Sequence, residues 1–167
     1  MFVVAEKYIS DCRMDLTLSI ALPVGLGGVA GFMTSSETQG QWYQSLKKPS
    51  WTPPKSAFGP VWVTLYILMG IAAWRVWRAG GRDQPMLLYG AQLALNIAWS
   101  FLFFKAHNLQ WALFDIVALL GMLIATTYSF YGVDQAAGHL MIPYVAWVSL
   151  ATALTANLYI NNPAGAS

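Results

Sequence analysis

The sequence predicts an all-α membrane protein, a bundle of five transmembrane helices with a long first loop rich in proline and tryptophan. Three observations lead to this fold class. Hydrophobic residues make up 57% of the 167 residues. Charged residues make up only 10%, against about 25% in an ordinary soluble domain, so there are too few polar side chains to cover a soluble surface. Five stretches with almost no charge are each long enough for a helix to cross a hydrocarbon core about 30 Å thick.

The composition also excludes several other classes of protein. High apolar content argues against a disordered chain. A net charge of only +2, with no long basic run, argues against a nucleic-acid partner. The single cysteine, Cys12, cannot form an internal disulfide. The apolar runs are too long for a transmembrane β-barrel and lack its alternation.

The chain is expected to form one transmembrane domain over residues 16–162, between two short tails. Its five spans are expected at residues 16–34, 58–77, 86–104, 109–133 and 136–160. Lipid offers no partners for backbone groups, so each span must be helical. The mixed charges of residues 1–15 fit a tail better than a signal peptide, and residues 163–167 form the other tail. Basic residues divide almost evenly between the two sides, so the positive-inside rule does not orient the chain.

The longest connection, residues 35–57, is rich in proline and aromatic residues. Trp42, Tyr43 and Trp51 suit the membrane interface, where the apolar ring and the polar edge are both satisfied. Pro53 and Pro54 stiffen the segment. The loop is therefore either an interfacial belt or a lid that holds a fixed shape over the bundle.

Small residues recur every four positions in two spans: Gly27 and Gly31 in the first, and Gly90, Ala94 and Ala98 in the third. Such stripes let helices approach closely, either within the chain or at an interface with a second subunit. The opposite face of the third span carries Gln92, Asn96 and Trp99. An amide near mid-span is costly in lipid, so Asn96 should face protein or a cavity.

Large aromatic and polar side chains share faces on the other spans: Trp62 and Tyr66, Trp111 and Asp115, and Tyr144, Trp147 and Ala151. Several helices that each contribute such a face suggest a shared cavity for a flat, apolar ligand. Ordinary packing between helices is the alternative. Asp115 is interpreted as a structural or ligand-orienting residue.

The sequence offers no recognisable catalytic or metal site. Its two histidines, His107 and His139, are expected on opposite sides of the membrane, and no HExxH or CxxC motif occurs. Serine and threonine are plentiful, but no buried histidine accompanies them as a base. No catalytic residue, metal or obligatory cofactor is therefore expected.

Several ordered motifs together resemble one known family. Residues 42–54 read WYQSLKKPSWTPP, and FGPVW follows at 58–62. Later matches are AQLALN at 91–96, WALFD at 111–115, and Pro143 and Tyr144 with Trp147. Over residues 16–162 the chain resembles the TspO/MBR family of translocator proteins, once called peripheral-type benzodiazepine receptors.

The resemblance implies a receptor or transporter-like membrane protein, often homodimeric, with a role in porphyrin homeostasis and the stress response. Its cavity under the first loop would bind protoporphyrin IX, haem and related flat apolar ligands. The matching ligand-binding positions are Trp51, Pro53, Trp62, Tyr66, Asn96, Trp99, Trp111, Trp147 and Ala151. The small-residue stripes at Gly27, Gly31, Gly90, Ala94 and Ala98 are the expected dimer interface. A bacterial membrane and the mitochondrial outer membrane both fit.

Other functions stay open at this point. Some family members are proposed to degrade porphyrin with light and oxygen, although the chain lacks acid–base machinery for dedicated catalysis. A sterol or lipid carrier is another, but Tyr159 is followed by Ile160, Asn161 and Asn162 rather than by the basic residue of the family's sterol motif. A structural membrane subunit without a ligand is the last. The family often has asparagine where this chain has Thr155.

Overall fold

The computed structural model describes residues 15–37 and 40–163, which form six helices and no strand. Five helices are long: α2 (Leu16–Thr34), α4 (Lys55–Arg78), α5 (Gln84–Phe104), α6 (Leu109–Val133) and α7 (Gln135–Asn161). All five are long and apolar enough to cross a membrane. The expected all-α bundle of five spans is thereby confirmed. The expected tails fall almost wholly at residues 1–14 and 164–167, outside the described residues.

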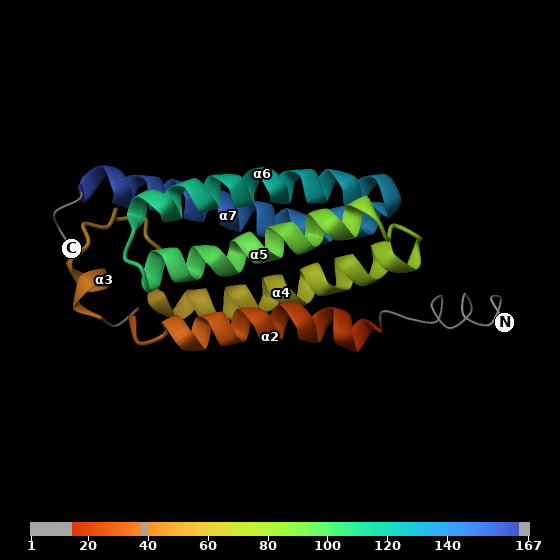
Figure 1. Cartoon of the computed structure of the whole chain (residues 1–167), viewed down its shortest axis with the longest axis horizontal. Helices are drawn as coiled ribbons and strands as arrows, with labels where there is room; N and C mark the ends of the chain where they lie inside the picture. The colour runs from red at the N-terminus through yellow and green to blue at the C-terminus, as the bar shows by residue number, and fades with distance from the viewer. Residues whose placement is uncertain (1–14, 38–39, 164–167) are drawn as a thin grey trace.

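The five long helices lie side by side along one axis, and consecutive helices run in opposite directions (Figure 1). Helix α6 packs against α5 and α7, while α4 packs against α2 and α7. The centre of the bundle contains fully buried side chains from three helices, among them Met69, Leu123 and Met141. The short helix α3 (Gln41–Ser45) lies in the first loop at one end of the bundle (Figure 1).

Gly70 sets the closest approach between α2 and α4. A Cβ atom on Gly70 would lie only 2.6 Å from the backbone oxygen of Ser19 and 2.8 Å from the Cα of Ile20. Both atoms belong to the backbone of α2, so they cannot rotate away. The absence of a side chain at Gly70 therefore allows the backbones of the two helices to come close together here.

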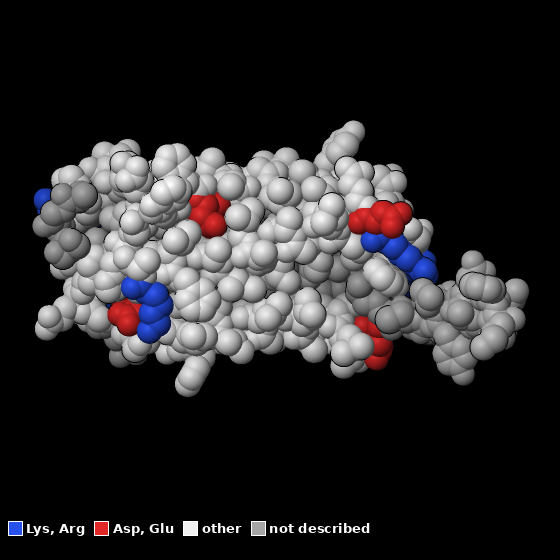
Figure 2. Space-filling view, in the orientation of Figure 1, with Lys and Arg blue, Asp and Glu red and all other residues white. Residues whose placement is uncertain are grey.

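Charged side chains gather at the two ends of the bundle (Figure 2). The middle of the visible face is free of Lys, Arg, Asp and Glu except for one acidic patch set in from an end (Figure 2). At the end opposite α3, Arg75 makes two hydrogen bonds to the Asp134 carboxylate, at 3.0 and 2.9 Å. Asp134 also accepts from the backbone N–H of Ala137 and so caps the start of α7. This distribution fits a bundle whose middle lies in hydrocarbon.

Candidate ligand-binding site

The first loop folds over one end of the bundle and buries two of its apolar side chains there. Tyr43 on α3 and Leu46 just after it are both buried. The Tyr43 ring lies 6.2 Å from the ring of Phe103 and 5.9 Å from that of Phe104. Burial raises the pKa of Tyr43, so its hydroxyl stays neutral. The loop therefore has a packed interior of its own, as a lid requires.

One polar clamp ties the loop to the end of α7. The side-chain oxygen of Asn162 accepts from the Lys47 N–H at 2.9 Å, and its amide nitrogen donates to the Lys47 carbonyl at 3.4 Å. The same nitrogen also donates to the carbonyl of Leu158 at 2.9 Å. One buried side chain therefore holds both backbone groups of a loop residue 115 positions away in the sequence.

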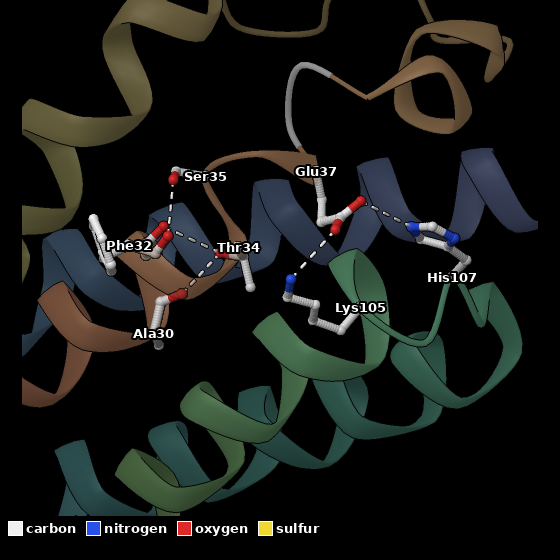
Figure 3. Close-up of polar contacts among 8 residues, drawn as sticks. Ala30, Phe32, Thr34, Ser35, Glu37, Lys105 and His107 are labelled. Atoms are coloured by element: carbon white, nitrogen blue, oxygen red, sulfur yellow. Dashed lines mark hydrogen bonds and ion pairs between the residues drawn. The ribbon is translucent and has the colours of Figure 1, made fainter.

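A second set of contacts ties the end of α2 to the loop between α5 and α6. Glu37 points between Lys105 and His107, at 3.3 and 3.6 Å (Figure 3). The His107 ring stacks on Trp42 with centroids 4.2 Å apart. His107 also has a φ of 50°, which is uncommon for a residue other than glycine. In this conformation the His107 ring contacts Trp42 and lies near the Glu37 carboxylate.

A narrow pocket lies beneath this loop, between α4, α5 and α7. Aromatic side chains and one proline supply much of its wall: Tyr43, Pro53, Phe58, Trp99, Phe103, Phe104 and Trp147. The rest of the wall comes from α7: Leu150, Ala151, Leu154, Thr155 and Leu158. The space left inside is only about 30 Å³, room for one or two water molecules. The pocket is therefore apolar, lined by aromatic rings and narrow.

An aromatic and amide cluster lies next to the pocket and shares Trp147 with it. The rings of Trp62 and Tyr66 stack at 5.5 Å, and Trp62 meets Trp147 edge-on at 6.5 Å. The Tyr66 hydroxyl donates to the side-chain oxygen of Asn96 at 2.8 Å, and both residues are buried. Because this hydrogen bond satisfies two polar groups deep in the bundle, it fixes the orientation of both side chains.

The structure divides the nine expected ligand-binding residues into three groups. Four line the pocket: Pro53, Trp99, Trp147 and Ala151. Three form the neighbouring cluster: Trp62, Tyr66 and Asn96. The remaining two are exposed and lie outside the pocket wall: Trp51, at 47%, and Trp111, at 61%. Trp111 packs against Phe114 on α6, and Asp115 on the same helix is likewise absent from the pocket wall.

The expected dimer-interface residues also lie in different surroundings. Gly31, Gly90 and Ala94 are exposed, Ala98 is half-buried, and a Cβ on Gly31 or Gly90 would meet nothing within 4 Å. Gly27 is buried, and a Cβ there would lie 2.1 Å from the ring of Tyr66. This contact within one chain accounts for Gly27 without a second subunit.

Four aromatic residues of the pocket wall were not among the expected site residues: Tyr43, Phe58, Phe103 and Phe104. Tyr43 and Phe58 stand inside the motifs at 42–54 and 58–62 that carry the family resemblance, so for these two residues the signal was present in the sequence. Spacing along the sequence could not show that these side chains line the pocket, because Tyr43 lies in the loop and Phe58 lies in the first turn of α4. Position along the chain does not reveal which way a loop side chain points.

Polar groups facing the pocket are few, and several buried ones have no partner. The indole N–H groups of Trp99 and Trp147 are both buried and unpaired. Deeper in the bundle, the side-chain oxygen and nitrogen of Gln92 are also unpaired. No group of three potential metal ligands occurs among residues 15–37 and 40–163. The pocket wall therefore offers mainly apolar stacking surfaces.

The bundle of five apolar helices and its pocket define a multi-pass integral membrane protein with a narrow, aromatic-lined pocket at one end. Comparison with known proteins places it more narrowly. The family model described as the TspO/MBR family matches residues 19–160, and the chain belongs to this family. The resemblance predicted from the motifs is thereby confirmed.

Relatives come from mammals and from bacteria. The chain is 42% identical to the human translocator protein over 127 residues, which cover 73% of this chain and 75% of that one. It is 38% identical to the protein CrtK of Rhodobacter capsulatus over 154 residues, covering 90% and 96%. It is 39% identical to the tryptophan-rich sensory protein of Cereibacter sphaeroides over 114 residues, covering 68% and 72%.

Proposed function

We propose that this protein binds tetrapyrroles such as protoporphyrin IX and haem in the pocket under the first loop, and that it acts in porphyrin homeostasis and the stress response. The observation that carries the proposal is the pocket wall, where flat rings from α3, α4, α5 and α7 meet. Aromatic faces stack favourably on a flat macrocycle, and the apolar surroundings suit its edges.

The small volume of the pocket limits how a ligand could enter it. A space of about 30 Å³ cannot hold a macrocycle, so binding requires the loop to move. The clamp at Asn162 and the Glu37 contacts are a small number of polar interactions, and each can break separately. The proposal therefore includes a lid that is closed in the empty protein and displaced by the ligand.

The most direct mutational test is Trp147→Ala, because this residue belongs both to the pocket wall and to the neighbouring cluster. Removing a buried Trp from a binding site typically costs 2 kcal/mol or more, so protoporphyrin IX should bind at least about tenfold more weakly. The measurement is a titration of the porphyrin absorption band with the full chain in lipid nanodiscs.

The matched control is Trp74→Ala, which removes a Trp from α4 where it lies beneath Arg78 at the last turn of the helix. Its affinity for protoporphyrin IX should equal that of the wild type. Equal affinities for all three proteins would refute the pocket as the binding site.

We also propose a homodimer that forms through the outer face of α5. Gly90 and Ala94 are exposed there, and small residues permit close helix contact in lipid. Ala94→Trp should convert the dimer to a monomer in cross-linking experiments in membranes. Ala125→Trp, at an exposed position on α6, is the control and should leave the dimer intact. A dimer that persists in both variants would place the interface elsewhere.

A further inference from the structure

His107 joins three segments at the end of the bundle that carries the first loop. It lies between α5 and α6. Its ring stacks on Trp42 of α3, with the centroids 4.2 Å apart and the planes inclined by only 15°. Its Nε2 atom lies 3.6 Å from the carboxylate of Glu37, just after α2 (Figure 3). One imidazole therefore connects the helix in the first loop, the segment that leads into that loop, and the bundle itself.

Trp42 carries this contact to the pocket. Its ring meets the ring of Phe103 edge-on at 5.7 Å, and Phe103 lines the pocket. The next residue, Tyr43, is buried and lines the pocket as well. Helix α3 has only five residues, too few to be stable without tertiary contacts. The contact between His107 and Trp42 therefore helps to decide whether α3, and Tyr43 with it, stays against the bundle.

The charge of His107 changes the strength of both of its contacts. Histidine is the side chain whose charge ordinarily changes between about pH 5 and pH 8. A neutral imidazole only stacks on Trp42, and its Nε2 atom has no hydrogen-bond partner in the described part of the chain. A protonated imidazole adds a cation–π interaction with the indole and an ion pair with Glu37. One proton therefore strengthens two contacts that hold the loop.

The charged groups that face the His107 ring are Glu37, after α2, and Lys105, at the end of α5. Lys105 lies 3.3 Å from one carboxylate oxygen of Glu37, and His107 lies near the other. The positive charge of Lys105 opposes protonation of His107, but the carboxylate stands between the two side chains (Figure 3). All three side chains are partly exposed, so water weakens each interaction and the combined effect is modest.

From this geometry we propose that His107 is a pH switch for the first loop: the protonated ring holds α3 against the bundle over the pocket, and the neutral ring releases it. The inference rests on the function proposed above, because it names what regulates access to the same pocket. The proton stabilises the closed loop, so the closed fraction is largest in mild acid and falls as the pH rises.

Hydrogen exchange of the full chain in nanodiscs, without any ligand, tests the switch. The amides of residues 41–52 are followed at about pH 5.5 and about pH 8, on either side of the range in which histidine titrates. Each rate is divided by the intrinsic exchange rate at that pH, which gives a protection factor. In the wild type this factor should fall about threefold or more at the higher pH, as expected for one exposed cation–π contact and one exposed ion pair.

Two substitutions fix the charge at this position. His107→Gln has no charge, so protection should be low at both pH values. His107→Arg keeps a positive, planar group that stacks on aromatic rings, so protection should be high at both. Both replacements carry the same backbone cost at a φ of 50°, which cancels when they are compared. His139→Gln, in the first turns of α7 at the opposite end of the bundle, is the control and should show the wild-type fall.

Two results of the exchange experiment would refute the switch. The first is equal protection of the wild type at the two pH values. The second is a fall of the same size in His107→Gln, because another group would then be responsible.

A second measurement connects the switch to the pocket. Protoporphyrin IX should associate about threefold or more slowly with His107→Arg than with His107→Gln, both at pH 7, so that the ionisation of the ligand is the same. Saturable binding with equal association rates would refute His107 as a control of the pocket. If exchange changes as expected but no porphyrin binds, the proposed function fails while the pH switch of the loop stands.

Discussion

Asp134 joins three parts of the molecule through one carboxylate. It accepts two hydrogen bonds from Arg75 on α4 and one from the first turn of α7. The Arg75 guanidinium and the backbone N–H of Ala137 hold the pKa of this carboxyl below its usual value. The charged form is therefore the one that stabilises the fold, although the partly exposed position keeps the effect small.

The pH dependence follows from the direction of that shift. A carboxyl with a lowered pKa in the folded state stabilises the protein above its ordinary pKa of about 3.9, and this contribution is lost as the pH falls through the folded value. The thermal midpoint of the wild type should therefore decline below about pH 4. Asp134→Asn keeps a good helix cap but loses the ion pair, so its midpoint should start lower and change less in acid.

Thermal unfolding in detergent between pH 3 and pH 7 measures this difference. Parallel curves for the wild type and Asp134→Asn would show that the carboxylate contributes nothing beyond its role as a helix cap.

At the scale of single residues, the sequence predicts the chemistry of a side chain better than the direction in which that side chain points. The inward face of α5 could be predicted, because Gln92 and Asn96 are too polar to face lipid, and both are buried. Trp111 could not be placed in the same way. Helical spacing puts it on one face with Asp115, but spacing does not say whether that face turns toward the pocket or away from it. That depends on how α6 packs on its neighbours.

At the scale of helices, the contact between α2 and α4 depends on Gly70. Gly70→Ala would place a methyl group within 2.6 Å of the α2 backbone and force the helices apart, which should cost about 1–3 kcal/mol. Gly59→Ala is the control on the same helix, because its Cβ would meet nothing within 4 Å. The control should be neutral or slightly more stable, since alanine favours a helix by up to about 1 kcal/mol.

Thermal midpoints of the two variants in detergent test this contact. If Gly70→Ala is no less stable than Gly59→Ala, the helices do not pack as closely as the structure shows.

The lid is expected to depend on the clamp between α7 and the loop. Asn162→Ala removes both hydrogen bonds to Lys47, so the loop should open more often. Hydrogen exchange of the amides at residues 46–52 should become faster, by at least a few-fold if one net hydrogen bond of about 1 kcal/mol is lost. Asn161→Ala, whose side chain bonds to Asn157 on its own helix, should leave the exchange unchanged. Equal exchange in both variants would mean that other contacts hold the loop.

The sequence predicts the long helices well and the lid poorly, for physical reasons. A charge-free run of about 20 residues has one stable structure in lipid, so α6 begins and ends where its apolar run does. Helix α3 has only five residues, too few to be stable alone, and it forms because Tyr43 packs on the bundle. Helix α4 begins at Lys55, three residues before its predicted start. Pro54 disfavours the helical conformation in the residue before it, so the helix does not extend further toward the N-terminus.

At the scale of the whole molecule, five spans place the first and second loops on opposite sides of the membrane. Single cysteines at Ser50 and at Ala79, in a chain with Cys12→Ser, report the two sides separately. In sealed vesicles with one orientation, a membrane-impermeant thiol reagent should label one of them and reach the other only after permeabilisation. Labelling of both without permeabilisation would contradict the five-span arrangement.

The central claim is that rings from separate helices enclose one binding pocket beneath the first loop. The most direct measurement is an experimental structure of the full chain in lipid with protoporphyrin IX bound. The account predicts a macrocycle in contact with Trp99 and Trp147, with the loop displaced to admit it. A porphyrin bound only on the outer surface of the helices, with the pocket still closed over about 30 Å³, would contradict it.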